Sequence, residues 1–325
     1  MLSNLWSLDL EGVQKRMIEI KNLTKKFDQF IAVNDLSFNV GEGEVLGFLG
    51  PNGAGKSTTM KVITGFLSPS SGSILIDGND VSIKPIHAKA LIGYLPEGAP
   101  CYGDMTPLEF LKFIAEIRGF QGRGCTDRVE HVIREVDLQK VCMQPIDTLS
   151  KGFKRRVGLA QAILHDPKVL ILDEPTDGLD PNQKHHVREL IKSLAKDKIV
   201  IISTHILEEV SAVCTRAIII DSGKIVADGT PEELESHSQY HNAVSVELSA
   251  EYDLVKDLSS LTNVSLQKDS ENSFTITSKN RQPIFAEISE IAQGNKWPIS
   301  EFYVKKGQLE DVFRSVTQKT GEGIK

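Results

Sequence analysis

The sequence predicts an α/β domain followed by a small α+β domain. Short, continuous runs of Val, Ile and Leu recur through the first two thirds of the chain, which suits strands buried on both faces of a parallel sheet. Segments with apolar residues at helical spacing lie between these runs. The composition becomes polar near Thr230. We therefore expect an N-terminal extension at 1–16, a first domain at 17–232 and an accessory domain at 233–325.

Four apolar runs of the first domain are the expected strands of this sheet: VLGFL (45–49), KVLILD (168–173), KIVIIST (198–204) and RAIIID (216–221). Helices are expected between them. The segment MTPLEFLKFIAEIRG opens with Thr106, Pro107 and Glu109, which form a capping box with proline at the first helical position. In DRVEHVIREVDL, the valines and the isoleucine fall on one helical face.

The accessory domain has a different pattern of elements. The expected order is strand (243–248), helix (252–260), strand (263–268), strand (273–278), helix (281–293), strand (297–304) and helix (308–317). This βαββαβ order with one extra helix predicts a ferredoxin-like domain.

Charge and hydropathy exclude some classes of protein. The net charge is −7, so no global basic field attracts DNA or RNA, and no nucleic-acid partner is expected. No apolar run approaches the roughly 20 residues that a membrane-spanning helix needs. The N-terminus carries Asp9 and Glu11 and lacks a basic region before an apolar one, which is not typical of a secretory signal.

A glycine-rich segment follows the first of the expected strands. GPNGAGKS, residues 50–57, fits the phosphate-binding pattern G-x-x-x-x-G-K-[ST]. Glycines allow successive backbone N–H groups to turn inward around phosphate oxygens, and the helix that begins near Lys56 adds its positive dipole end. Lys56 is expected to reach the β- and γ-phosphates, and the Ser57 hydroxyl is expected to bind Mg²⁺.

A second candidate site closes the strand at 168–173. KVLILDEPTDGLD carries adjacent carboxylates, Asp173 and Glu174, at the end of an apolar run. Ligands bind at the carboxyl ends of strands in open α/β sheets. One carboxylate could hold Mg²⁺, directly or through water, and the next could polarise an attacking water. Two adjacent acids could also form a solvated turn, but the phosphate-binding loop upstream favours the functional interpretation.

Four motifs occur together in a fixed order: GPNGAGKST, LSKGF, LILDEPTDGLD and STH. This set resembles the ATP-binding subunits of ATP-binding cassette (ABC) transporters, over about residues 17–232. The resemblance implies a P-loop NTPase fold of the ABC type and hydrolysis of ATP with Mg²⁺.

The resemblance also assigns roles to residues on one side of the site. The following would hold ATP: Phe27 on the adenine, and Gly50, Pro51, Asn52, Gly53, Ala54, Gly55, Lys56, Ser57 and Thr58 around the phosphates. Asp173 would support Mg²⁺ beside Ser57 and Glu97. Glu174 would be the catalytic base, and His205 would contact the γ-phosphate. By itself, Phe27 is more often a core residue, and His205 a structural histidine at a strand end.

Three further residues would act across a dimer. Ser150 and Gly152 match the signature that reaches the γ-phosphate of the opposite subunit, and Asp180 matches the loop that couples the two sites. By itself, Ser150 is an N-cap residue of a helix. On an exposed surface, such a helix N-terminus can also receive a phosphate from another molecule.

The chain departs from the common pattern at two places. Lys151-Gly152-Phe153 replaces the usual Gly-Gly-Gln, and Glu97 stands where many members have glutamine. Glu97 together with LSKG resembles the gliding-motility and antibiotic-resistance group of ABC exporters, as does the tail KKGQLEDVFRSVT. The resemblance thus implies an exporter ATPase that forms a homodimer around ATP. It would drive a separate membrane permease as a peripheral subunit on the cytoplasmic face of the inner membrane.

Two other classes fit less well. A soluble ABC ATPase acting on ribosomes or DNA usually has two cassettes, or a long coiled coil between the P-loop and the signature. Here one P-loop is present, and the span from Lys56 to Ser150 leaves no room for a coiled coil. A P-loop GTPase would need an N-K-x-D motif, and GNKWP at 294–298 lacks the aspartate.

Overall fold

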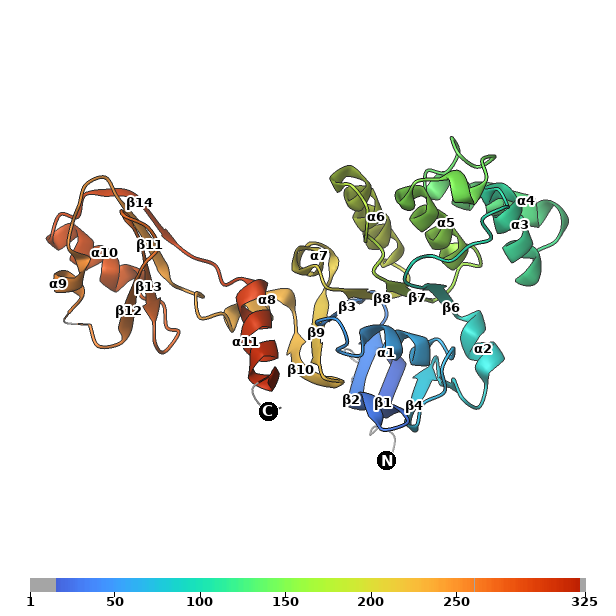
Figure 1. The fold of residues 1–325 in the computed structure, drawn as a ribbon, viewed down its shortest axis with the longest axis horizontal. Helices are drawn as coiled ribbons and strands as arrows, with labels where there is room; N and C mark the ends of the chain where they lie inside the picture. Colours follow the sequence, from blue (N-terminus) through green and yellow to red (C-terminus); the bar gives the residue numbers. More distant parts are fainter. Residues whose placement is uncertain (1–15, 260, 322–325) are drawn as a thin grey trace, which may run out of the picture. The chain divides into compact units, whose positions relative to one another are not determined.

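The computed structural model describes residues 16–259 and 261–321. The expected N-terminal extension falls almost entirely on residues 1–15, outside this part of the chain. The chain forms two compact units, Met1–Ile225 and Val226–Lys325, and the division falls within strand β10 (Lys224–Gly229) (Figure 1).

A six-stranded sheet forms the centre of the first unit, with the order β10-β9-β3-β8-β7-β6. Its other strands are β3 (Val45–Leu49), β6 (Ile92–Leu95), β7 (Val169–Asp173), β8 (Ile199–Thr204) and β9 (Arg216–Asp221). The strands β9, β3, β8, β7 and β6, in this spatial order, each run parallel to their neighbours. Every residue of β3, β7 and β8 is buried, so the continuous apolar runs are strands covered on both faces, as predicted.

One face of this sheet packs against a second, antiparallel sheet and helix α1 (Lys56–Ile63). The second sheet has the order β2-β1-β4-β5, from β1 (Arg16–Phe27), β2 (Phe30–Gly41), β4 (Ser71–Ile76) and β5 (Asn79–Asp80). This second sheet was not among the elements predicted from the sequence. Its strands lack the continuous apolar runs of the parallel sheet, because an antiparallel sheet can leave one face in solvent.

The other face of the parallel sheet packs against α3 (Pro107–Ile117), α4 (Gly122–Glu135), α5 (Lys151–Ile163) and α6 (Pro181–Leu194) (Figure 1). Successive side chains of β7 point to opposite faces of the sheet. Val169 and Ile171 pack in the core shared with the antiparallel sheet and α1, whereas Leu170 and Leu172 pack in the core shared with α3 to α6. Shorter helices complete the unit: α2 (Pro85–Ala90), the 3₁₀ helix at Ile146–Thr148 and α7 (Leu207–Val213).

The second unit has the predicted βαββαβ order. Its elements after β10 are α8 (Pro231–Ser236), β11 (Val244–Leu248), α9 (Leu254–Leu258), β12 (Val264–Lys268), β13 (Ser273–Ser278), α10 (Phe285–Gly294), β14 (Ile299–Val304) and α11 (Leu309–Gly321). The antiparallel sheet has the order β12-β13-β11-β14, which is the ferredoxin-like arrangement. Within residues 16–259 and 261–321, no helix is both long and apolar enough to cross a membrane.

The capping box predicted for α3 is formed, and it gives a test of this fold. The Thr106 hydroxyl accepts a hydrogen bond from the Glu109 backbone N–H at 3.2 Å, and the Glu109 carboxylate accepts one from the Thr106 N–H at 2.9 Å. We expect Thr106→Ala to lower the free energy of unfolding by about 1 kcal/mol, because the first turn loses an acceptor. Urea unfolding followed by circular dichroism measures this loss. Thr106→Ser keeps the hydroxyl and should stay near wild type; an equal loss in both variants would contradict the capping explanation.

Candidate functional site

The P-loop connects the end of β3 to the start of α1. Its glycines are required by close backbone contacts: a Cβ on Gly50 would lie 2.4 Å from the Ile220 carbonyl oxygen, and one on Gly55 would lie 2.4 Å from that of Ala32. Gly55 also has a φ of 106°, a conformation that favours glycine. The absence of side chains at Gly50 and Gly55 therefore allows the loop backbone to pack directly against the backbone of Ile220 and Ala32.

The P-loop leaves donors available at the start of α1. Gly55 caps this helix without any side-chain hydrogen bond, so its first N–H groups are not capped by a side chain. Asn52 and Gly53 at the tip are exposed, while Ala54 is buried and Thr58 half-buried. An N-terminus of this kind attracts an anion.

Lys56 lies almost fully buried in this loop. Its Nζ donates to the carbonyl oxygens of Gly50 at 2.6 Å and Pro51 at 3.1 Å. Burial lowers the pKa of Lys56 from its ordinary value, and the nearby charges of Glu174, Asp173 and Glu97 oppose this shift. The ammonium group thus lies in the field of all three predicted acids of the site.

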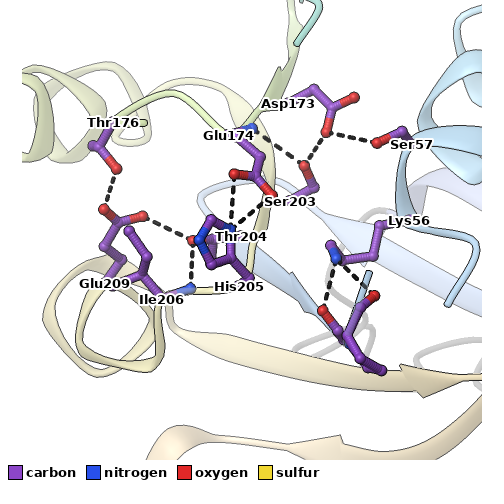
Figure 2. A network of polar contacts seen from close by, with 12 residues as sticks. Lys56, Ser57, Asp173, Glu174, Thr176, Ser203, Thr204, His205, Ile206 and Glu209 are labelled. Carbon is purple, nitrogen blue, oxygen red and sulfur yellow. Dashed lines mark hydrogen bonds and ion pairs between the residues drawn. The ribbon is translucent and has the colours of Figure 1, made fainter. Parts of the chain in front are cut away.

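Asp173, at the end of β7, is fully buried between two serine hydroxyls (Figure 2). Its Oδ1 accepts from Ser57 Oγ at 3.3 Å and from Ser203 Oγ. Its Oδ2 is buried and has no hydrogen-bond partner in the described part of the chain. A buried carboxylate oxygen without a partner is costly. The unpartnered oxygen beside a hydroxyl therefore fits a site for a hard cation such as Mg²⁺.

Glu174 follows directly and contacts His205. The His205 Nδ1 lies 2.9 Å from one carboxylate oxygen and 2.8 Å from the other. The Glu174 backbone has a φ of 52°, which is unusual for a residue other than glycine. Its N–H donates to the carbonyl and hydroxyl oxygens of Ser203 at 3.0 and 3.2 Å. Strain of this kind persists where surrounding contacts hold it, and such places cluster at functional sites.

Arg155, from α5, is one of the residues that hold the Glu174 backbone. It was not among the residues predicted from the sequence. Its guanidinium is buried and donates to the backbone oxygens of Glu174 and Pro96, the latter at 3.3 Å. Desolvation lowers the pKa of Arg155, although the surrounding carboxylates oppose this. In the sequence, KRR on a helix looks like a solvated basic face, so nothing signals that one of these arginines points inward. Ser203 was also missed as a partner of Asp173, although it lies in the STH motif.

Two predicted residues lie nearer the surface. Phe27 ends β1 and is 42% exposed, with Lys25 Nζ 5.0 Å from its ring centroid. The alternative interpretation of Phe27 as a core residue is therefore wrong. Glu97, just beyond β6, is exposed. Both side chains are therefore partly or fully accessible from solvent.

The residues predicted to act across a dimer are separate from this cluster. Ser150 is exposed and caps α5, accepting from the Phe153 N–H at 3.4 Å. Asp180 caps α6 and accepts from the Gln183 N–H at 2.9 Å. A Cβ on Gly152 would lie 2.3 Å from the Gln183 side-chain oxygen, so Gly152 packs against α6. In residues 16–259 and 261–321, no polar contact joins these three residues to the P-loop or to the Asp173–His205 cluster.

The sequence and the fold of this chain are similar to those of known proteins. The profile of the family described as ABC transporter matches residues 33–177. The chain is 40% identical, over 223 residues, to the uncharacterized ABC transporter ATP-binding protein YxlF of Bacillus subtilis, a match that spans 69% of this chain and 74% of YxlF. It is 38% identical, over 218 residues, to the Nod factor export ATP-binding protein I of Burkholderia lata, spanning 67% and 72% of the two chains.

A solved structure of the ATP-binding subunit of an ABC transporter matches with a TM-score of 0.63 and 31% sequence identity, covering 67% of this chain and 92% of that one. These similarities agree with the phosphate-binding loop, the buried aspartate and the acid–histidine pair described above. The resemblance inferred from the four motifs is thus confirmed: the chain belongs to the family of ABC transporter ATP-binding proteins and is an ATPase of the ABC type.

Proposed function

We propose that this chain is the ATPase subunit of an exporter, that it forms a homodimer around two ATP molecules, and that it drives a separate membrane permease. The observation that carries this proposal is the division of the site. Lys56, Asp173 and Glu174 converge at one sheet edge, whereas Ser150 caps another helix without contacting them. A second copy, related by a two-fold axis, would supply Ser150 to each site.

The proposed cation is Mg²⁺, held by Ser57 Oγ and Asp173. The described residues contain no group of three or more His, Cys, Asp or Glu side chains arranged for a metal. Mg²⁺ typically uses one or two protein ligands together with phosphate oxygens and water, which agrees with this small set. Bound there, the ion would neutralise phosphate charge. We also propose that Glu97 contributes to this site, through water, from its exposed position.

The proposed chemistry follows from the positions of the residues. Backbone N–H groups of the P-loop and the Lys56 ammonium would orient the triphosphate, and Phe27 would stack on the adenine. The Glu174 carboxylate would orient and deprotonate the attacking water, while His205, in contact with that carboxylate, would meet the γ-phosphate. The exposed start of α5 in the partner would face the same phosphate.

The proposed permease site is an apolar groove next to α3. Its volume is about 410 Å³, and it is lined by Pro100, Cys101, Tyr102, Phe110, Phe113, Ile114, Ile117 and Gln161. Phe110 is buried, whereas Ile117 is 64% exposed, so α3 carries more apolar surface than its core-facing stripe uses. Exposed apolar surface beside a groove suits a helix from a partner protein. The export direction rests on the similarity to a Nod factor export subunit.

Lys56→Ala should abolish ATP binding while the fold survives. Among the described residues, the Lys56 ammonium contacts P-loop carbonyl oxygens and forms no ion pair with an acidic side chain. Its removal should therefore weaken phosphate binding without breaking a structural salt bridge. Titration with a fluorescent ATP analogue measures the affinity, and the thermal midpoint checks folding. Unchanged affinity in the folded variant would refute the assignment of this loop.

Glu174→Gln is the test of the proposed function. We expect hydrolysis to fall by about a hundredfold or more, because a general base is lost, and ATP-bound dimers to accumulate. Light scattering after size-exclusion chromatography, with Mg-ATP and with Mg-ADP, measures the mass. Adding Ser150→Arg should restore the monomer by obstructing the interface. A Glu174→Gln protein that stays monomeric at saturating ATP would rule out the simple homodimer.

Ile117→Lys should detach the permease while ATP hydrolysis continues, because a charge would have to be desolvated in the groove. Val255→Lys is a matched control, since Val255 is 65% exposed and lies in the second unit. The measurement is the membrane protein that copurifies in mild detergent, identified by mass spectrometry. Retention by both variants, or loss by both, would contradict the assignment of this groove.

A further inference from the structure

Glu209, on α7, is a buried acid to which the proposed chemistry gives no role. Only 4% of its surface is exposed. One carboxylate oxygen accepts a hydrogen bond from the Thr176 hydroxyl, and the other accepts one from the Thr204 hydroxyl at 2.9 Å (Figure 2). The carboxylate therefore bridges two threonines that are 28 positions apart in the chain.

The two threonines belong to the two segments that carry the reacting side chains. Thr176 lies two residues after Glu174, on the loop that leads to Asp180, and Thr204 directly precedes His205. The Glu174–His205 contact therefore joins the loop after β7 to the segment after β8. Glu209 joins these two segments a second time, through Thr176 and Thr204. Two separate connections fix the relative position of the segments better than one.

The hydrogen bonds in this bridge have a fixed direction. The Ile206 N–H donates to the Thr204 hydroxyl oxygen at 3.0 Å, and the Thr204 proton is directed at Glu209. An ionised carboxylate only accepts hydrogen bonds, so both threonines must donate to it. A glutamine of the same shape accepts with one atom and donates with the other, and it can therefore satisfy only one threonine in its present orientation.

The bridge is also costly to build. Within the described residues, no ion pair gives Glu209 a cationic partner, so its buried charge depends on hydroxyl donors. Burying a carboxylate in this way opposes folding. Apolar side chains of similar volume could link the two loops without the desolvation free energy that a buried carboxylate costs.

We propose that Glu209 is a positioning residue for ATP hydrolysis, which holds the His205 segment against the Glu174–Asp180 loop. The proposal rests on the roles proposed above for Glu174 and His205. Because the loop continues to Asp180, displacement of Asp180 by the partner subunit is passed through Thr176 and Glu209 to the segment that carries His205. Glu209 itself contacts neither nucleotide nor water in the reaction.

The first experiment compares Glu209→Gln with Glu208→Gln in the full-length chain. Glu208 is the matched control, because its carboxylate is 79% exposed and pairs with Arg188 at 3.2 Å on the surface. We expect Glu209→Gln to lower kcat about tenfold, the effect of losing one hydrogen bond to a charged group. KM for ATP should change by less than about twofold, because the P-loop is untouched. Glu208→Gln should match wild type. Wild-type kcat in Glu209→Gln overturns the proposal.

A double-mutant cycle separates positioning from general damage. Thr176→Val removes the donor at nearly constant volume, and Thr176→Ser retains it, so the valine variant should lose kcat and the serine variant should recover most of it. The kcat losses of Glu209→Gln and His205→Ala should be strongly non-additive, because Glu209 acts through the His205 segment. Additive losses would show that Glu209 acts elsewhere and would overturn the proposal. If Glu209→Gln fails to fold, the comparison of Thr176→Val with Thr176→Ser provides the same test.

The controls distinguish this inference from the proposed function. If Glu174→Gln keeps full activity, the roles assigned to Glu174 and His205 fail, and the positioning proposal fails with them. If Glu174→Gln is inactive while Glu209→Gln and Thr176→Val are both fully active, the proposed function stands and Glu209 is excluded as a positioning residue.

Discussion

The buried carboxylate of Asp173 is the interaction on which the rest of the site depends. It ends β7, receives the Ser57 hydroxyl from the P-loop helix, and receives the Ser203 hydroxyl from β8. The adjacent strands β7 and β8 and the N-terminus of α1 are thereby joined around one charge, at the carboxyl ends of the two strands. The carbonyl and hydroxyl oxygens of Ser203 also accept from the Glu174 N–H, so the proposed metal ligand and the proposed base are held by the same residue. The unpartnered oxygen of Asp173 is what this arrangement leaves available for a cation.

The positions of the P-loop and of the two acids after β7 could be predicted because they depend on residue types at fixed spacing. A glycine loop between a strand and a helix, and two acids after a buried strand, have few other physical explanations. The ferredoxin-like order of the second unit was also predictable, because its strands and helices follow short, well-separated apolar patterns. The antiparallel sheet of the first unit was not, since a strand such as RMIEIKNLTKKF has charged residues throughout. The contacts of Arg155 and Glu209 were hidden for the opposite reason. Each looks like a surface charge in its helix, and its burial depends on the tertiary packing of other elements.

The location of strain adds to this picture. Glu174 adopts a left-handed backbone conformation that a side chain makes unfavourable, and its N–H, its carbonyl and its carboxylate are each bound by a different segment. These segments are β8, the signature helix α5 and the loop that carries His205. A change in any of them therefore alters the position of the proposed base. If Glu174 is the base as proposed, a shift of α5 would alter hydrolysis through the contact of Arg155 with the Glu174 backbone.

The charge balance around Lys56 connects the chemistry to assembly. The buried Lys56 ammonium and Arg155 guanidinium both lie in the field of Asp173, Glu174 and Glu97, so the acids of the site outnumber its two buried cations. A triphosphate adds further negative charge, which the P-loop N–H groups and the dipole of α1 offset only in part. The Mg²⁺ proposed at Asp173 would reduce this excess of negative charge. The exposed start of α5, capped by Ser150, offers another set of N–H donors, but within the described part of a single chain those donors make no hydrogen bond to the P-loop or to the Asp173–His205 cluster. In the proposed homodimer, the attraction between the γ-phosphate and that helix end of the second copy would favour association of two copies when ATP binds, and hydrolysis would remove this attraction.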